Sequence, residues 1–289
     1  MGRHSVFSCI CFWTWLMLAN EALAQVRNDR LYNDIVSGGA SELRLSLVAG
    51  TPADAEIFAP DTDLAIGLLE LAVAAKNDDA VAELLQVGAR FDSLEGRFGN
   101  SSILEVLAQQ GLVLALAAYI DEDSSTLVEA GADALLAAVA YGQLPAAELL
   151  LDRMNAIVGQ RQVQTDEALI WAARRNDAAA TQMLLARGAD APSSLALVAA
   201  VANCSPDSAR ELLSYRADPL PYYEGEHVAS YAWRCFLVVS DEEDAVGRFS
   251  EIVQLLYEAD SSICPVLVNV RGEESARVTS VLENLDLCQ

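Results

Sequence analysis

Hydrophobic residues along the chain recur at helical spacing, in a register that itself repeats. The segments "ELLQVGARFD" (83–92) and "MLLARGADAP" (183–192) share paired leucines followed by a Gly-Ala turn. Sliding the chain along itself by the same displacement aligns Leu69 with Leu169, Ala72 with Ala172 and Gly88 with Gly188. The spacing predicts a first helix with small residues, a second helix with the paired leucines, and a glycine that ends the second helix in a left-handed conformation.

Further copies of the pattern fill the rest of the chain. Two copies lie between the first pair, at 101–123 and 134–155, where Leu104 and Leu135 take the place of Leu69. Weaker copies occur at 32–54, at 195–219 with Leu197 in register, and at 228–262 with an insertion. The sequence therefore predicts about seven helical hairpins, each about 33 residues long.

This register resembles the ankyrin repeat family, whose repeat has the pattern TPLHxAA, a turn with glycine, a leucine-rich second helix and GAD. The copies nearest to it are "LIWAARRNDAAATQMLLARGAD" (169–190) and "LELAVAAKNDDAVAELLQVGAR" (69–90). The resemblance implies an all-α solenoid of stacked hairpins over residues 25–263. A different helical-hairpin solenoid is the alternative, because such folds share short loops and similar periodicity.

The sequence departs from the family in one respect: the Thr-Pro and His of TPLH are missing from every copy. In that motif they are expected to hold the first helix and its turn by hydrogen bonds, so the turns here need other partners. Helix-capping residue types precede several predicted helices. The candidate caps are Ser101, Ser102, Asp166, Ser193 and Ser194.

A lone helical hairpin cannot bury its apolar stripe, so neighbouring copies must stack into one core. The in-register leucines supply the bulk of that core, and alanines such as Ala72 and Ala172 allow close approach of the first helices. Residues 264–289 form a separate element. Their apolar positions, including Val278 and Leu282, fall on one side, as expected of a C-terminal cap helix.

The N-terminal 24 residues have the pattern of a secretory signal peptide. Arg3 precedes an apolar run from Val6 to Leu18, and Ala22-Leu23-Ala24 forms a small-residue cleavage site. The run is shorter than the roughly 20 residues of a membrane span. We expect cleavage after Ala24, a periplasmic or secreted protein, and no membrane insertion after cleavage.

Four cysteines lie beyond the signal segment, Cys204, Cys235, Cys264 and Cys288. An even number in an exported chain, without CxxC spacing, favours two disulfides, of which three connectivities are possible. We favour Cys264–Cys288, which would pin the cap helix to the stack, and this leaves Cys204–Cys235. Cys204 and Cys235 fall at similar places in adjacent copies, whose helix axes are about 8–10 Å apart. Disulfide Cα atoms are usually within about 7 Å, so that bond requires a local irregularity.

The formal charge is −24, and Lys76 is the only lysine. Such an acidic surface disfavours nucleic acid and anionic membranes as partners. The acidic clusters at 121–123 and 241–244 offer oxygen ligands, but they lack the alternating DxDxDG spacing of a calcium loop. We interpret both as solvated turns and predict no metal and no cofactor.

Few residues are suited to catalysis. His227 is the only histidine beyond the signal segment, and no GxSxG, P-loop or GxGxxG motif occurs. A helix-start or surface role for His227 is favoured over a role as base, because no nucleophile is placed for it. The alternative function is an exported hydrolase that uses carboxylates on an α-helical scaffold, although no carboxylate pair is distinguished from the rest. We do not expect an enzyme.

Recognition is the remaining class of function. The ankyrin resemblance implies a concave surface, lined by hairpin loops and first helices, that binds a protein partner. Aromatic and arginine side chains dominate interface energetics. In the loops these are Arg97, Phe98, Arg161, Tyr222 and Tyr223. We expect a monomer that binds an unidentified exported protein.

Overall fold

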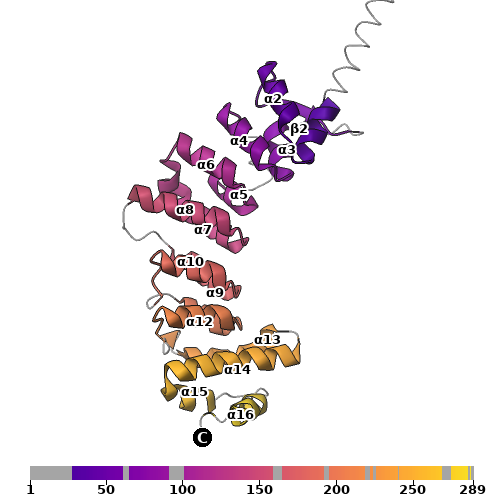
Figure 1. The fold of residues 1–289 in the computed structure, drawn as a ribbon. Helices are drawn as coiled ribbons and strands as arrows, with labels where there is room; N and C mark the ends of the chain where they lie inside the picture. Colours follow the sequence, from indigo (N-terminus) through magenta and orange to yellow (C-terminus); the bar gives the residue numbers. More distant parts are fainter. Residues whose placement is uncertain are drawn as a thin grey trace, which may run out of the picture. The chain divides into compact units, whose positions relative to one another are not determined.

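The computed structural model consists of helical hairpins in two compact units, residues 1–124 and 125–289 (Figure 1). It describes residues 28–60, 65–90, 101–158, 165–191, 195–218, 222–223, 226–239, 241–268, 275–285 and 287. In these ranges seven helix pairs follow one another, three in the first unit and four in the second. The predicted all-α solenoid of about seven repeats is confirmed.

The first unit begins with a helix over 28–36. Its other elements are α2 (Ser41–Val48), β1 (Glu56–Phe58), β2 (Ala65–Gly67), α3 (Leu68–Ala74), α4 (Asp78–Gln86), α5 (Ile103–Gln110) and α6 (Val113–Glu122). Strands β1 and β2 pair antiparallel, with Ile57 opposite Ile66, at the junction of the first two repeats. A β-turn followed by two helices is the ankyrin repeat unit, which favours the ankyrin-like architecture over other helical-hairpin solenoids.

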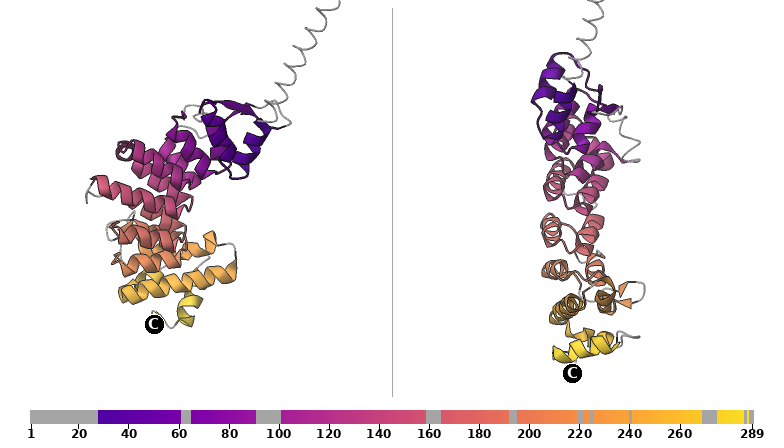
Figure 2. Two further views of the ribbon diagram at one scale, coloured as in Figure 1. Left: turned by 45° about the horizontal axis from the view of Figure 1, so that its top comes forward. Right: turned by 90° about the vertical axis from the view of Figure 1, so that its right-hand side faces the viewer.

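The second unit repeats this organisation. Its helix pairs are α7 (Thr126–Ala140) with α8 (Leu144–Val158), α9 (Asp166–Arg174) with α10 (Ala178–Ala186), α11 (Ala196–Ala202) with α12 (Pro206–Ser214), and the 3-10 helix η2 (Val228–Arg234) and α13 (Cys235–Val238) with α14 (Glu242–Ala259). Strands β3 (Tyr222–Tyr223) and β4 (Glu226–His227) pair before the last of these. Within this unit the first and second helices form two separate columns (Figure 2).

The turn inside most of the hairpins uses a left-handed residue. Lys76, Gly111, Gly142, Asn176 and Cys204 each lie between the two helices of a pair, with φ between 55° and 75°. This conformation has a low energy for glycine, a moderate energy for asparagine, and is strained for most other residues. The backbone therefore turns at the same place in every one of these copies, whether or not glycine is present.

Asparagine and aspartate side chains replace the missing TPLH hydrogen bonds. Asn77 caps α4 by accepting from the backbone N of Ala80 at 3.1 Å, and its amide donates to the carbonyl oxygens of Ile35 and Gly39 in the preceding repeat. Asp177 caps α10 in the same way, accepting from Ala180 N at 3.0 Å. The bonds that Asn77 and Asp177 accept satisfy helix N–H groups that have no intrahelical partner.

Turn residues also cap helices of the next repeat. The carboxylate of Asp78 accepts from the backbone N of Leu114 and of Ala115, both at 2.8 Å, at the start of α6. Asn176 Oδ1 accepts from the backbone N of Asp207 and of Ser208, at 2.9 and 3.1 Å, at the start of α12. The turns are thus tied both to their own hairpin and to a neighbour.

The structure confirms only some of the capping residues suggested by the sequence. Ser102 caps α5 in a full capping box with Glu105, and Ser101 precedes it. The suggestion for Asp166 was wrong, because this residue is already inside α9, and Thr165 before it makes no side-chain cap bond. Ser193 and Ser194 lie outside the described residues.

In each unit the core lies along the first helices. The in-register residues of these helices are each 3% exposed or less; they are Leu69, Ala72, Leu104, Leu135, Leu169, Ala172 and Leu197. Gly88 and Gly188 follow the second helices α4 and α10 with φ of 83° and 96°. Bulky leucines and close-packed alanines therefore alternate on the buried stripe.

A disulfide joins Cys204 and Cys235, whose Cα atoms are 4.9 Å apart. The bond is possible because Cys204 sits in the left-handed turn between α11 and α12, where it is not held at the distance of helix axes, and because η2 precedes Cys235. It ties the sixth repeat to the seventh.

The chain ends in the cap. Short helices η3 (Ser261–Ile263) and α15 (Cys264–Val268) precede α16 (Ser275–Asn284), which buries Val278, Val281 and Leu282. Cys264, at the start of α15, is itself disulfide-bonded, and Cys288 lies outside the described residues. In the described part of the chain no helix combines the length and apolar character needed to cross a membrane.

Candidate protein-interaction surface

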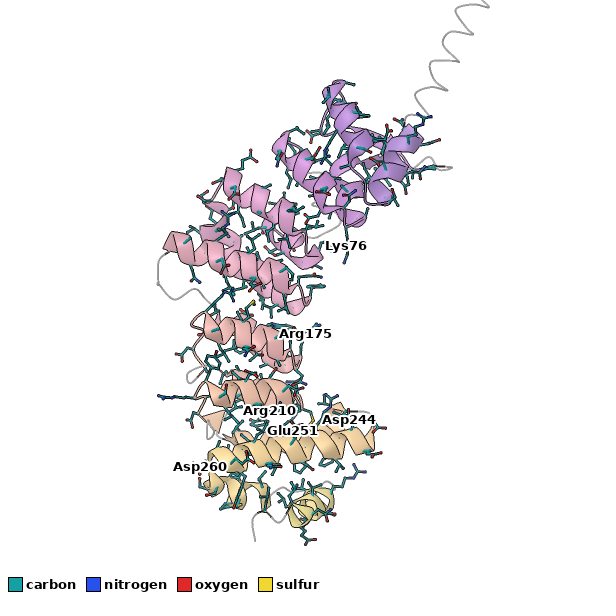
Figure 3. All side chains as sticks on the ribbon, viewed as in Figure 1. Lys76, Arg175, Arg210, Asp244, Glu251 and Asp260 are labelled. Carbon is teal, nitrogen blue, oxygen red and sulfur yellow. A yellow bond between two sulfur atoms is a disulfide. The ribbon has the colours of Figure 1, made fainter. Side chains whose placement is uncertain are left out.

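Arginines on the second helices are paired with carboxylates. Arg187, directly after α10, bridges to Glu148 at 3.0 Å and to Asp152 at 3.2 Å, both on α8. Arg210 of α12 pairs with Asp207 at 3.0 Å and also with Glu251 of α14 (Figure 3). These exposed pairs contribute little stability one by one, but they neutralise the arginines on this layer.

The side chain of Asp207 has two partners. Arg210 and Asn176 both donate to its carboxylate, at 3.0 and 2.9 Å. These hydrogen bonds, first from Arg210 and then from Asn176, hold the pKa of Asp207 below its ordinary value. Asp207 is therefore a fixed anion that is already engaged by its own neighbours.

The first helices of the second unit present a different surface. Trp171 and Arg174 of α9 and Arg175 next to them are exposed, and so is Tyr141 at the end of α7. Tyr141 and Arg175 occupy equivalent positions, because each directly precedes the left-handed residue of its turn. We call these four residues the first-helix surface.

Two contacts order its arginines. The guanidinium carbon of Arg174 lies 5.0 Å from the centroid of the Trp171 ring, a cation–π arrangement. Arg175 Nη1 donates to the carbonyl oxygen of Ala140, at the end of α7, at 2.7 Å. Figure 3 shows Arg175 at the turn end of α9. The two guanidinium groups are thus partly immobilised before any partner arrives.

Small side chains surround the first-helix surface. Ala137 and Ala199 occupy the positions of Trp171 in the adjacent repeats, and Ala140 and Ala202 occupy those of Arg174. Helix α9 packs between α7 and α11. The Trp171 side chain is therefore flanked by alanines on both neighbouring first helices. Trp171 is 36% exposed and Tyr141 is 59% exposed, so aromatic area is available for contact.

The last repeat adds apolar area to the same layer. In α13, Leu237 is 62% exposed and Val238 is 52% exposed. Beneath them the Phe236 ring packs against Phe249 of α14, with ring centroids 5.2 Å apart. The exposed side chains are therefore carried on an anchored element.

The loop residues proposed from the sequence are only partly placed. Arg97, Phe98 and Arg161 lie outside the described residues. Tyr222 and Tyr223 form strand β3, where Tyr222 pairs with His227 across the hairpin.

His227 starts the 3-10 helix η2. Its Nδ1 accepts from the backbone N of Ala229 at 3.0 Å, and the side chain is 7% exposed. Burial lowers its pKa from the ordinary value, against the opposing charges of Asp218 and Asp260. Burial and the hydrogen bond accepted at Nδ1 both favour the neutral imidazole. His227 thus has the helix-start role expected from the sequence.

Two described carboxylates have pKa values that depart from the ordinary range. The pKa values of Asp207 and Asp260 are lowered, Asp260 by its hydrogen bonds from Ser262, whereas a carboxylic general acid needs a raised pKa. Among the described residues no His, Cys, Asp and Glu side chains gather in threes as a metal site. In the acidic cluster at 121–123, Asp123 and Glu122 add to the effect of burial in raising the pKa of Tyr119.

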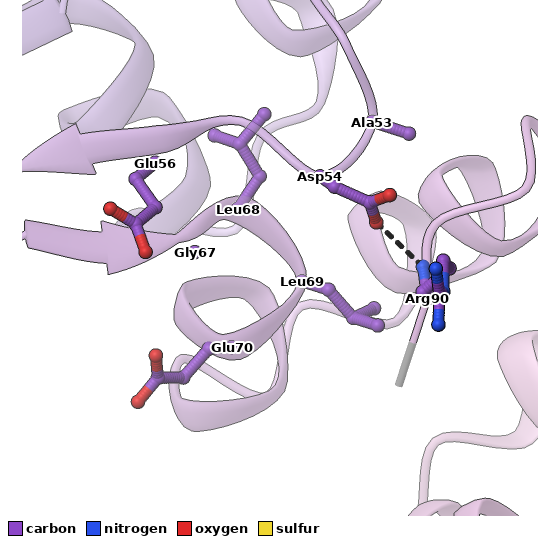
Figure 4. Close-up of a pocket in the computed structure, with 8 residues that line it drawn as sticks. All are labelled: Ala53, Asp54, Glu56, Gly67, Leu68, Leu69, Glu70 and Arg90. Carbon is purple, nitrogen blue, oxygen red and sulfur yellow. Dashed lines mark hydrogen bonds between the residues drawn. The ribbon is translucent and has the colours of Figure 1, made fainter. Parts of the chain in front are cut away.

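A hollow of about 340 Å³ lies in the first unit, between the β1–β2 hairpin and the start of α3 (Figure 4). Glu56, Glu70, Asp54 and Arg90 contribute its charged groups, and Asp54 accepts from the backbone N of Arg90 at 2.7 Å. None of its lining residues is a histidine, serine or cysteine, and its ionisable groups are three carboxylates and one arginine.

The first-helix surface was not predicted from the sequence, because only aromatic and arginine residues in the loops were considered as partner contacts. The signal was present in "LIWAARRN" (169–176), where the residues that flank the buried Ala172-Ala173 pair are a tryptophan and two arginines. At the equivalent positions most other copies have alanine or glutamine.

No protein-family model and no curated protein sequence matches the chain. Solved structures of ankyrin repeat domains are similar to it. The ankyrin repeat domain of human ASB11 is 18% identical with a TM-score of 0.49, over 75% of this chain and 96% of that one. The ankyrin repeat domain of Bcl-3, a member of the IkappaB family, is 22% identical with a TM-score of 0.48, over 78% of this chain and 97% of that one.

Proposed function

We propose that the chain is an exported scaffold that binds a protein partner through the first-helix surface. The observation that carries the proposal is the exposed Trp171 between Arg174, Arg175 and Tyr141, on helices that are otherwise lined with alanine. Tryptophan, tyrosine and arginine are the residue types most enriched among interface hot spots. A rigid stack of hairpins holds them without the entropic cost of ordering a loop.

The partner is an exported protein, because the N-terminal 24 residues have the pattern of a signal peptide. Cleavage after Ala24 leaves a mature chain that begins at Gln25 in the periplasm or outside the cell. N-terminal sequencing of the protein from the exported fraction checks this directly. Recovery only from the cytoplasm, with residues 1–24 retained, contradicts export.

Affinity capture from the exported fraction tests binding. The bait is the tagged full chain, compared with the double variant Tyr141→Ala/Trp171→Ala. Tyr215→Ala is the matched control, because Tyr215 is 40% exposed but lies at the C-terminal end of α12, the opposite end of the hairpin from the turn. We expect a stoichiometric partner with the wild type and the control.

The double variant should bind that partner at least about 30-fold more weakly, the loss expected for a single hot-spot truncation of about 2 kcal/mol. Circular dichroism should show that both variants retain the helical content of the wild type. Equal capture by wild type and double variant would exclude the first-helix surface as the binding site.

A further inference from the structure

Arg174 and Arg175 have no carboxylate partner within the described residues. By contrast, Arg44, Arg187, Arg210 and Arg248 each pair with a carboxylate, in a chain with 42 Asp and Glu against 18 Lys and Arg. Their contacts are instead the Trp171 ring and the carbonyl oxygen of Ala140. The fold therefore leaves two adjacent cations open on an acidic protein.

The carboxylate of Asp207, near the start of α12 in the next repeat, accepts from Asn176, which directly follows Arg175 in the sequence. The same carboxylate also pairs with Arg210. Because Asp207 already has these partners, it does not compensate Arg174 and Arg175.

The geometry favours a carboxylate as the group that these arginines bind. A guanidinium has five N–H donors in a planar fork that matches a carboxylate in bidentate fashion. Arg175 uses Nη1 to hold the end of α7, so Nε and Nη2 remain as donors. Arg174 is stacked on Trp171, and this contact leaves the edge of its guanidinium available.

We propose that the first-helix surface binds an acidic segment of the partner protein. Carboxylates of the segment pair with Arg174 and Arg175, and an adjacent apolar side chain packs on Trp171 and Tyr141. This inference rests on the proposed function and adds the chemistry of the partner to it. The attraction is local, because at physiological ionic strength charges farther away than about 8 Å are largely screened. The net charge of −24 therefore does not prevent it.

The test uses two fluorescently labelled peptides of equal length, one of alternating Glu and Leu and one of alternating Lys and Leu. Fluorescence polarisation measures their binding to the full chain and to Arg174→Gln/Arg175→Gln. Arg216→Gln is the matched control, because Arg216 is an exposed arginine beyond α12, at the opposite end of its hairpin.

We expect the Glu peptide to bind the wild type and the control equally, and the double variant about ten-fold more weakly, as for the loss of two exposed ion pairs. Raising the salt concentration should weaken the wild-type complex and narrow this difference.

Equal binding of the Glu peptide to the wild type and the double variant overturns the proposal. So does preference for the Lys peptide, or failure of both peptides to bind. The affinity capture is independent of these results. A partner that offers neutral or basic groups would still need Tyr141 and Trp171 for binding. The two proposals can therefore fail separately.

Discussion

Single residues in this chain have roles that their position in the repeat determines. Leu169 and Trp171 are two positions apart on the same helix, yet Leu169 is fully buried and Trp171 is 36% exposed. The register decides which side chain stabilises the stack and which is available to a partner. Substitutions at the two kinds of position should therefore separate stability from binding.

Leu169→Ala should destabilise the protein by about 2–5 kcal/mol, because it removes buried methyl groups and leaves a cavity. Leu237→Ala makes the same chemical change at a side chain that is 62% exposed, and it should cost much less. Denaturant unfolding of both variants measures the difference. Similar losses at the two sites would show that the assigned register is wrong.

His227 should make stability depend on pH. Burial lowers its pKa below the ordinary value of about 6.5, so the unfolded chain binds the proton more tightly than the folded one. The contribution of neutral His227 to the free energy of unfolding is fully present above about pH 6.5. It is lost as the pH falls through the lower pKa of the folded state.

His227→Asn retains an oxygen that can accept from the backbone N of Ala229 but does not titrate. The free energy of unfolding of the wild type should therefore fall relative to that of the variant as the pH falls below about 6.5. Denaturant titrations from neutral to mildly acidic pH measure it. A difference that stays constant over this range would show that His227 does not titrate on unfolding.

At the scale of elements, hairpins are held to their neighbours by side chains in the turns. Asn176 has φ of 56° and caps α12 of the next repeat through its Oδ1. One residue thus combines a left-handed turn with a capping bond between repeats. The sequence indicated that the turns lacked the family's Thr-Pro and His. Some of the substitutes are local caps, as at Asn77 and Asp177, but others act between repeats, which a local capping rule does not detect.

Two variants of Asn176 separate these roles. Asn176→Gly keeps the left-handed turn and loses the cap, with an expected cost of about 0.5–2 kcal/mol. Asn176→Ala loses the cap and also strains the backbone, and should cost about 1 kcal/mol more. Thermal or denaturant unfolding compares them. If Asn176→Ala is as stable as Asn176→Gly, the left-handed turn carries no energetic penalty and that part of the account is wrong.

At the scale of the whole molecule, the repeat framework was predictable from the sequence and the proposed interaction surface was not. Leu69, Leu169 and the Gly88 and Gly188 turns repeat along the chain because stacking demands the same residue at the same place in each hairpin. Partner contacts obey no such rule. Trp171 and the two arginines stand out only once Ala172 and Ala173 are known to face the core.

The Cys204–Cys235 disulfide shows the same limit. The spacing between helix axes in adjacent repeats is too large for the Cα separation of a disulfide. Cys204 lies in a left-handed turn between two helices, so this spacing does not apply to it. The pairing itself was expected from the sequence, as the one left by Cys264–Cys288. The turn conformation that makes it possible was not, because a left-handed turn at a non-glycine residue leaves little trace in a single sequence.

Hydrogen–deuterium exchange of the captured complex is the most direct test of the central claim. Binding through the first-helix surface predicts slower exchange at the end of α7, over 137–141, and at the end of α9, over 171–176. The second helices α10 and α12 should exchange as they do in the free protein. Protection confined to α10 and α12, with α7 and α9 unchanged, would contradict the account.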